Sequence, residues 1–329
     1  MSHPVLTQPS TTALRVHSFA GLEPGPKLLV LGAVHGNEVC GSRGIERIIA
    51  EFDAGTLSLQ CGQVTFVPIT NPLAYHLKQR MGDRNLNRNL RPTNPPVDYE
   101  DRIANALCPL LAAHDALLDL HSFHTGGEPF AMLGPQNNTG TLEPFAHAEQ
   151  EQALAVRLGV RRIVEGWLDT YARGVARRLA YSDASLRAQM LSTDPSYGVG
   201  TTEYMRSQGG YAITLECGQH EDPAAPEVAY RAIHNTLALL GLIDAPRPAP
   251  HPAPELLRLA EVIDRLHPDD AFSREWKSFD PVQAGERIGT RHDGTPVTAP
   301  GTGFIVFPNP KSLPGNEWFY FALPSERKL

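Results

Sequence analysis

Residues 27–47 read KLLVLGAVHGNEVCGSRGIER. The apolar run 28–31 predicts a strand, and the isoleucine spacing from Ile45 onward predicts a helix. His35 and Glu38 lie between the two elements, three residues apart, and a turn entering a helix places side chains at this spacing on one side. An imidazole and a carboxylate are two of the three protein ligands in one type of catalytic zinc site. The alternative interpretation is a surface histidine beside a glutamate that the helix dipole favours.

The composition is ordinary for a globular protein. The chain has 329 residues, of which 41% are hydrophobic and 20% are charged. Its net charge of -7 argues against a nucleic-acid-binding surface and against an anionic membrane as the partner. No apolar run approaches the roughly 18 residues of a membrane span. A negative protein that binds anionic substrates concentrates its arginines locally, which points to a pocket.

The cysteines and the N-terminus predict the cellular compartment. The four cysteines are widely spaced and form no CxxC motif, which is typical of free thiols: Cys40, Cys61, Cys108 and Cys217. Residues 1–18 lack the basic and apolar regions of a secretory signal. We therefore expect a cytoplasmic protein.

Strands and helices alternate along much of the chain. Strands are predicted within residues 13–20, 28–31, 62–70, 115–120 and 211–215. Helices are predicted from Ile45 onward and over residues 73–78, 98–114, 149–158, 170–179 and 227–242. This alternation predicts an α/β fold with a mixed, mostly parallel sheet flanked by helices.

Three candidate functional residues follow predicted strands. His35, His121 and Glu216 each come directly after one of these apolar runs. In sheets of this kind, ligands bind at the carboxyl ends of the strands. We therefore expect the three side chains to meet at one edge of the sheet.

The character of the sequence changes near residue 245. Residues 245–255 read APRPAPHPAPE and predict a semi-rigid, proline-rich spacer. Beyond Leu266, glycines alternate with short β-like runs. We predict an α/β domain over residues 1–245 and a small β-rich domain over residues 255–329.

A polar loop over residues 80–91 is dense in arginine and asparagine. It begins RMGDRNLNR and has no apolar face. Arginine suits bidentate capture of carboxylates, and a long loop in a compact domain is often functional. The alternative interpretation is a solvated surface loop.

Two carboxylates at strand ends are further candidates. Asp119 lies two residues before His121 and would orient its imidazole. Glu216 would serve as a general base beside a metal ion. Either residue is equally compatible with an ordinary acidic side chain at the end of a strand.

Four ordered motifs together resemble the succinylglutamate desuccinylase/aspartoacylase family, a branch of the zinc carboxypeptidase-like superfamily. They are HGNE at residues 35–38, RMGDRNLNR at 80–88, DLHS at 119–122 and TLECG at 214–218. The resemblance covers about residues 25–245. It implies a zinc carboxypeptidase-like fold for this part of the chain.

The resemblance also implies roles for individual residues. It implies one zinc ion per chain, bound by His35, Glu38 and His121, with a fourth position open to water. Glu216 would take a proton from that water and later give one to the leaving amine. Arg80 matches the family arginine that polarises the scissile carbonyl and holds its oxyanion.

Other positions concern the substrate. Asn87 and Arg88 match the family pair that binds a substrate carboxylate, and Arg206 matches a second substrate-binding arginine. The chain departs from the family pattern at Asn85, where aspartate is usual. The C-terminal part resembles a biotinyl/lipoyl-like barrel without an acceptor-lysine motif, so no attached cofactor is predicted.

These observations predict a zinc-dependent amidohydrolase. Its substrate would be an N-acyl amino acid or a similar small, linear amide that carries a carboxylate. A metallocarboxypeptidase or peptide amidase acting on short peptides is the second hypothesis, because the same residues would serve it. The third is a catalytically idle, zinc-containing binding protein, which the Asn85 departure favours. The predicted partner is thus a small molecule, not a nucleic acid or a membrane, and assembly into a homo-oligomer is left open.

Overall fold

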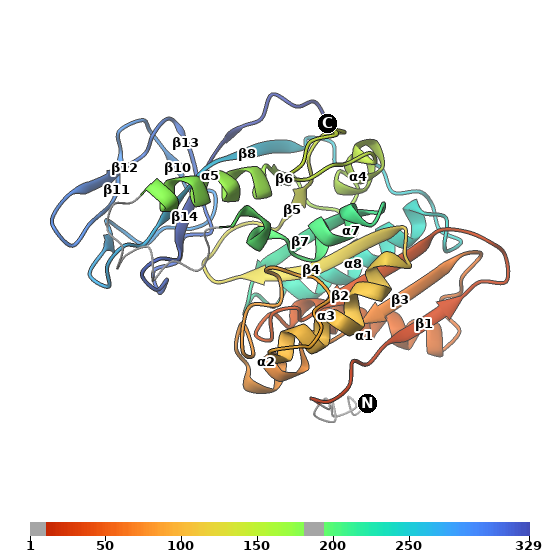
Figure 1. The fold of residues 1–329 in the computed structure, drawn as a ribbon. Helices are drawn as coiled ribbons and strands as arrows, with labels where there is room; N and C mark the ends of the chain where they lie inside the picture. Colours follow the sequence, from red (N-terminus) through yellow and green to blue (C-terminus); the bar gives the residue numbers. More distant parts are fainter. Residues whose placement is uncertain (1–10, 181–193) are drawn as a thin grey trace.

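The computed structural model describes residues 11–180 and 194–329. Residues 1–10, which belong to the stretch used to predict the absence of a secretory signal, lie outside this range, as do residues 181–193. Figure 1 shows strands crossing the middle of the molecule, with helices packed along them. No helix in the described ranges combines the length and apolar character needed to cross a membrane.

One large sheet organises the molecule. In chain order its strands are β1 (His17–Ala20), β2 (Lys27–Gly32), β3 (Gln63–Val67), β4 (Ala116–Phe123), β5 (Phe130–Leu133), β6 (Arg162–Glu165), β7 (Tyr211–Gln219), β8 (Glu255–Asp264), β10 (Pro281–Val282), β13 (Gly303–Val306) and β14 (Glu317–Pro324). Their spatial order is β1-β3-β2-β4-β7-β5-β6-β8-β14-β13-β10. Strands β3, β2, β4 and β7 run parallel, β5, β6 and β8 form a second parallel set, and the two sets meet where β7 and β5 pair antiparallel.

Helices cover both faces of this sheet. They are α1 (Cys40–Asp53), α2 (Pro72–Leu77), α3 (Tyr99–Ala112), α4 (Ala148–Ala155), α5 (Trp167–Ala180), α7 (Thr201–Ser207) and α8 (Ala225–Leu239), with a 3-10 turn η1 at Pro195–Gly198. Side chains alternate along β2, so Leu28 and Val30 enter a core with α1 and α8. Leu29 and Leu31 enter a second core with α3 and α7. Because β2 is buried on both faces, its sequence is continuously apolar.

The C-terminal strands extend the same sheet. Strand β8 pairs parallel with β6, and β14 pairs antiparallel with β8. A separate three-stranded sheet, in the order β12-β11-β9, consists of β9 (Ala271–Phe272), β11 (Arg287–Thr290) and β12 (Pro296–Thr298). Figure 1 shows β11 and β12, drawn in blue, at the opposite end of the molecule from β1. The division into domains at residues 245–255 stays a prediction.

The predicted fold class is confirmed, since the sheet is mixed and mostly parallel, has helices on its faces and carries extra C-terminal strands. Strands β4 and β7 extend past their predicted ends, so His121 and Glu216 lie inside strands and not after them. Strands β5 and β6 are not predicted from the sequence, because they are four residues long and carry too little pattern to detect. Helix α7 is also not predicted; at its start, Glu203 accepts a hydrogen bond from the Gly200 amide at 2.9 Å in a capping box.

Candidate metal centre

The loop between β2 and α1 positions two of the three candidate ligands, His35 and Glu38. The loop is closed by a hydrogen bond of 3.1 Å from the Glu38 amide to the His35 carbonyl. Gly36 packs against the start of α2 so closely that a Cβ atom there would lie 1.9 Å from the carbonyl carbon of Ala74. Only glycine fits this position, which explains the residue between the two candidate ligands.

The neighbouring strands β4 and β7 supply the third candidate ligand, His121, and the candidate general base, Glu216. His121 on β4 is the register partner of Glu216 on β7, so the two side chains lie beside each other on the same face of the sheet. Both residues are buried. The pairing of two parallel strands therefore brings together residues that lie far apart in the sequence.

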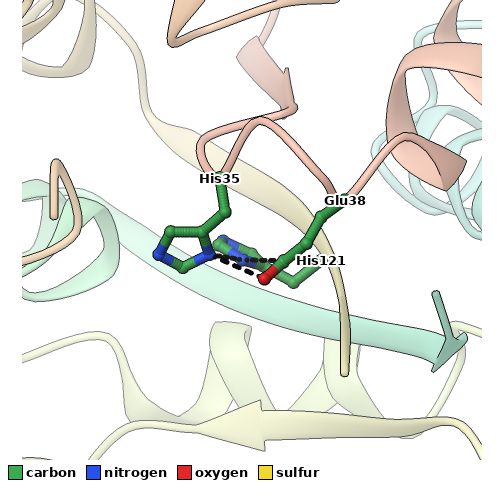
Figure 2. A group of neighbouring side chains, drawn as sticks. All are labelled: His35, Glu38 and His121. Carbon is green, nitrogen blue, oxygen red and sulfur yellow. Dashed lines mark hydrogen bonds and ion pairs between the residues drawn. The ribbon is translucent and has the colours of Figure 1, made fainter. Parts of the chain in front are cut away.

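His35, Glu38 and His121 converge on one point (Figure 2). The Nδ1 atom of His35 lies 2.9 Å from Oε1 of Glu38, and the Nδ1 atom of His121 lies 2.9 Å from Oε2. The two Nδ1 atoms are 3.2 Å apart. Each of the three residues is at most 2% exposed. Among the described residues, these form the one group of three potential ligands with ligand atoms all within 4.8 Å of one another.

The outer nitrogen of each imidazole faces an oxygen atom. His35 Nε2 lies 3.0 Å from Oδ1 of Asn85. His121 Nε2 lies 2.9 Å from Oδ2 of Asp119, as an ion-pair contact that does not have the geometry of a hydrogen bond. An oxygen beside Nε2 favours the tautomer that carries its proton there. The lone pair of each Nδ1 atom is then directed at the convergence point. Asn85, noted in the sequence only as a departure, thus has a position in the site.

The charges around this point favour a cation. Burial, assisted by the Arg80 guanidinium, lowers the pKa of His35 to about 4, so this imidazole is neutral at pH 7. Burial opposes charge on His121, but the Asp119 and Glu38 carboxylates raise its pKa well above the usual value. The Asp119 and Glu38 carboxylates therefore favour positive charge at this point. A divalent ion would supply positive charge in place of a His121 proton, because metal ligands bind in their deprotonated form.

Glu216 is a buried carboxyl group beside the candidate ligands. Burial is the largest cause that raises its pKa to about 8, and the Glu38 and Asp119 carboxylates contribute. Its Oε2 atom is buried without a hydrogen-bond partner among the described residues. A buried carboxyl group with a raised pKa and an unpaired oxygen is suited to exchange a proton with a ligand.

Two neutral imidazole nitrogens and one carboxylate are a donor set that suits zinc. The buried position, the directed Nδ1 atoms and the attraction for positive charge all fit a bound metal ion. The predicted ligand residues are thus brought together, and their binding of zinc stays a prediction.

Arg80 reaches the same point from the polar loop. Its Nη1 atom donates a hydrogen bond of 2.7 Å to Oε1 of Glu38. The loop over residues 80–91 contains no helix or strand, as predicted. A guanidinium at this distance from a ligand carboxylate is close enough to contact a molecule bound at the site.

Asn87 and Arg88 lie farther along the loop and line the same cavity. The Oδ1 atom of Asn87 accepts a hydrogen bond of 2.8 Å from the Thr201 amide, which leaves the side-chain nitrogen of Asn87 as a donor. The guanidinium carbon of Arg88 lies 4.8 Å from the centre of the Trp167 ring. Stacking on this ring holds Arg88 in place without neutralising its charge, because the ring carries none.

The metal-ligand group opens into a cavity of about 1480 Å³. One part of the wall comes from strand β7 and helix α7, and another comes from Phe307, which directly follows β13, and from Tyr320 in β14. The cavity therefore joins the candidate ligands to the C-terminal part of the chain.

Arg206 lines this cavity, but two carboxylates already accept hydrogen bonds from its guanidinium. Its Nε and Nη2 atoms donate to Glu151 at 2.9 and 3.0 Å, and its Nη1 atom donates to Glu143 at 2.7 Å. The substrate-binding role of Arg206 stays a prediction.

Two residues that support the site are not among the sequence predictions. The Ser122 amide donates to Oε2 of Glu38 at 3.1 Å, and the Thr201 hydroxyl donates to Oδ2 of Asp119. The DLHS motif contains Ser122, so its place beside His121 was the available signal. Thr201 had no such signal, because it comes from the missed helix α7.

Comparison with known proteins agrees with the sequence motifs. Residues 24–163 match the family model of the succinylglutamate desuccinylase/aspartoacylase catalytic domain. The resemblance stated from the sequence is therefore confirmed. No curated protein gives a significant sequence match.

Several solved structures share the fold. A succinylglutamate desuccinylase/aspartoacylase from Rhodobacter sphaeroides has a TM-score of 0.72 and 18% identity, over 95% of this chain and 90% of that one. A succinylglutamate desuccinylase from Vibrio cholerae has a TM-score of 0.69 and 20% identity, over 94% and 85%. An ectoine utilization protein from Ruegeria pomeroyi has a TM-score of 0.67 and 18% identity, over 94% and 88%. At these identities the likeness concerns the fold.

Proposed function

We propose that this chain is a zinc-dependent amidohydrolase, because residues 24–163 match the model of the succinylglutamate desuccinylase/aspartoacylase catalytic domain, a family of the deacylase type. Its substrate is an N-acyl amino acid or a similar small amide that carries a carboxylate. The products are a carboxylic acid and an amine.

The observation that carries this proposal is the convergence of His35, Glu38 and His121 beside the unpaired Oε2 atom of Glu216. Three ligands and an adjacent proton carrier are the parts that metal-assisted hydrolysis of an amide needs. A structural zinc site commonly has four protein ligands, whereas a set of three leaves room for a reactant.

Each residue then has a defined task. His35, Glu38 and His121 hold the zinc ion. Asn85 fixes the outer nitrogen of His35, and Asp119 fixes the outer nitrogen of His121. When bound, the ion would act as a Lewis acid at the scissile carbonyl and would lower the pKa of water toward 7.

Glu216 moves the proton. In its ionised form it accepts a proton as water attacks the carbonyl carbon, and it returns that proton to the amide nitrogen as the carbon–nitrogen bond breaks. Its pKa of about 8 falls near the pH at which a group can perform both transfers.

Three residues of the polar loop orient the substrate. Arg80 reaches the ligand group and stabilises the developing oxyanion. Arg88, held against Trp167, and the side-chain nitrogen of Asn87 bind the substrate carboxylate. This carboxylate fixes the position of the amide relative to Glu216.

The cavity volume favours a second candidate, a peptidase acting on short peptides. A volume of about 1480 Å³ exceeds what a single acylated amino acid fills, and pockets for drug-sized ligands run to roughly 1,000 Å³. The same residues would perform that reaction.

The cytoplasmic location also stays a prediction from the sequence.

A substrate panel tests both candidates. Zinc-loaded protein is incubated with acetyl and succinyl amino acids and with dipeptides, and products are followed by mass spectrometry. We expect release of free amino acid from acyl compounds, loss of that activity with a chelator and recovery with added zinc. Cleavage of dipeptides alone would favour the peptidase, and no cleavage by a fully metal-loaded protein would favour an idle binding protein.

A further inference from the structure

A second buried cluster of charges lies in the wall of the same cavity. It consists of Arg206 with three carboxylates, Glu143, Glu151 and Glu203, and is called the Arg206 cluster below. Glu151 is fully buried and accepts from Nε and Nη2 of Arg206 at 2.9 and 3.0 Å. Glu143 accepts from Nη1 at 2.7 Å, and Glu203 lies 3.5 Å from the same atom. One guanidinium therefore faces three carboxylates.

The contacts leave Arg206 without capacity for another anion. A guanidinium has five N–H donors, and four of them have partners here: two oxygens of Glu151, one of Glu143 and the Ala212 carbonyl at 2.9 Å. The fifth is on Nη1, which lies 3.5 Å from Oε1 of Glu203. Gly134 packs so closely that a Cβ atom there would lie 2.4 Å from Nε. A carboxylate of a ligand would have to displace Glu143 and approach two negative groups.

The cluster presents negative charge to the cavity. Glu143 and Glu203 line the cavity together with Arg206, whereas Glu151 is hidden beneath them. Burial is the largest cause that raises the pKa of Glu143 to about 7, and Glu203 and Glu151 add to the rise. A cation placed beside Glu143 would restore its ionised form.

The cluster lies where the side chain of a bound amino acid would extend. Asn87, which binds the substrate carboxylate in the proposed function, contacts Thr201 at the start of α7, and α7 carries Glu203 and Arg206. Strand β7 links the cluster to Glu216, because Arg206 contacts Ala212 on that strand. The four residue steps from 212 to 216 span about 13 Å, and Thr214 between them lines the cavity.

The unpaired Oε2 atom of Glu216 is an independent sign that a ligand enters this cavity. Glu216 is 7% exposed and belongs to the cavity lining, and a buried carboxylate oxygen without a partner costs free energy until a ligand supplies one. The same molecule would meet Glu216 at one end and the Arg206 cluster along its side.

We propose that the Arg206 cluster selects substrates whose amino acid carries a protonated amine at the end of its side chain, and disfavours those with a second carboxylate. This inference rests on the proposed function, since it specifies which acylated amino acid enters the site. Arg88 binds the α-carboxylate, and Glu143 and Glu203 attract the terminal ammonium group. The substrate class is thus an N-acyl diamino acid.

The first test is calorimetric binding of three free amino acids to the zinc-loaded protein. L-ornithine and L-norleucine have side chains of equal length and differ in the charge of the last group, and L-glutamate supplies the opposite charge. We expect ornithine to bind about 10-fold more tightly than norleucine, as one charge-assisted contact gives, and glutamate to bind more weakly than norleucine. Glutamate binding as tightly as norleucine, or ornithine no tighter, would overturn the proposal.

A variant locates the selectivity. Glu143→Gln keeps an oxygen that accepts from Arg206 but removes the charge, and we expect it to bring the ornithine-to-norleucine ratio close to one. Glu326→Gln is the matched control, because Glu326 lines another part of the cavity, and it should keep the wild-type ratio. An unchanged ratio in correctly folded Glu143→Gln would also contradict the assignment.

Hydrolysis separates this inference from the proposed function. The Nα-acetyl derivatives of the three amino acids are compared by kcat/KM. If the glutamate derivative has the highest kcat/KM of the three, the proposed amidohydrolase activity is supported and the proposed selectivity is overturned. Absence of hydrolysis together with tighter ornithine binding would overturn the amidohydrolase and support the selectivity.

Discussion

The metal-ligand group and the Arg206 cluster are both buried groups of ionisable side chains in one cavity wall, yet their chemistry is opposite. In the first, His35, Glu38 and His121 direct lone pairs at a shared point. In the second, Arg206 already donates to the carboxylates around it. Buried charge that is paired within the protein supports the fold and offers a ligand only the excess negative charge of the cluster, whereas lone pairs that converge without a cation indicate a site for a metal ion. Four measurements test this contrast.

The largest expected effect is the loss of metal in His35→Ala. Removing one of three ligands should reduce bound zinc from about one ion per chain to near zero and abolish turnover. Elemental analysis after gel filtration measures this. Full zinc occupancy in the variant would remove His35 from the ligand set. Glu143→Gln, from the other group, should keep its zinc.

Glu216→Gln should separate chemistry from metal binding. Since the amide cannot accept the proton, turnover should fall by about 100- to 10,000-fold while zinc content stays at the wild-type level. Steady-state kinetics and elemental analysis on the same sample measure both quantities. A near-normal rate would show that another group carries the proton.

Glu151→Gln tests the supporting role of the Arg206 cluster. It removes the charge of a fully buried carboxylate that also accepts from the backbone amides of Gly134 and Ala212. The free energy of unfolding should fall by about 3–5 kcal/mol, as for other broken buried pairs. Denaturant unfolding measures this. The matched control, Glu227→Gln, breaks the exposed pair with Arg47 and should cost about 1 kcal/mol or less.

The smallest expected effect is a pH dependence caused by Glu143. Burial raises its pKa from 4.5 to about 7, so between these values the folded protein holds a proton that the unfolded chain has released. Stability therefore falls as the pH rises through this window. Thermal unfolding is measured for wild type and Glu143→Gln between pH 4.5 and 7. The stability of wild type relative to the variant should decrease as the pH rises. An increase would contradict a raised pKa of Glu143.

Much of the fold was predictable because its central elements are strongly patterned. The apolar run at Leu28–Leu31 can be satisfied only by burial on both faces, and β2 is buried in this way. Strands β5 and β6 escaped prediction because four residues carry too little periodicity. They become strands because their neighbours in the sheet complete their hydrogen bonds.

The sequence by itself determined which residues form the candidate centre. His35, Glu38, His121 and Glu216 stand in local motifs whose residue types limit their chemistry. Only the tertiary structure decided what Asn85 and Arg206 contact. Asn85 lies against His35, and Arg206 is surrounded by carboxylates that come from separate parts of the chain. The physical reason is that the effective charge of a buried group depends on its neighbours in space, which local sequence does not specify.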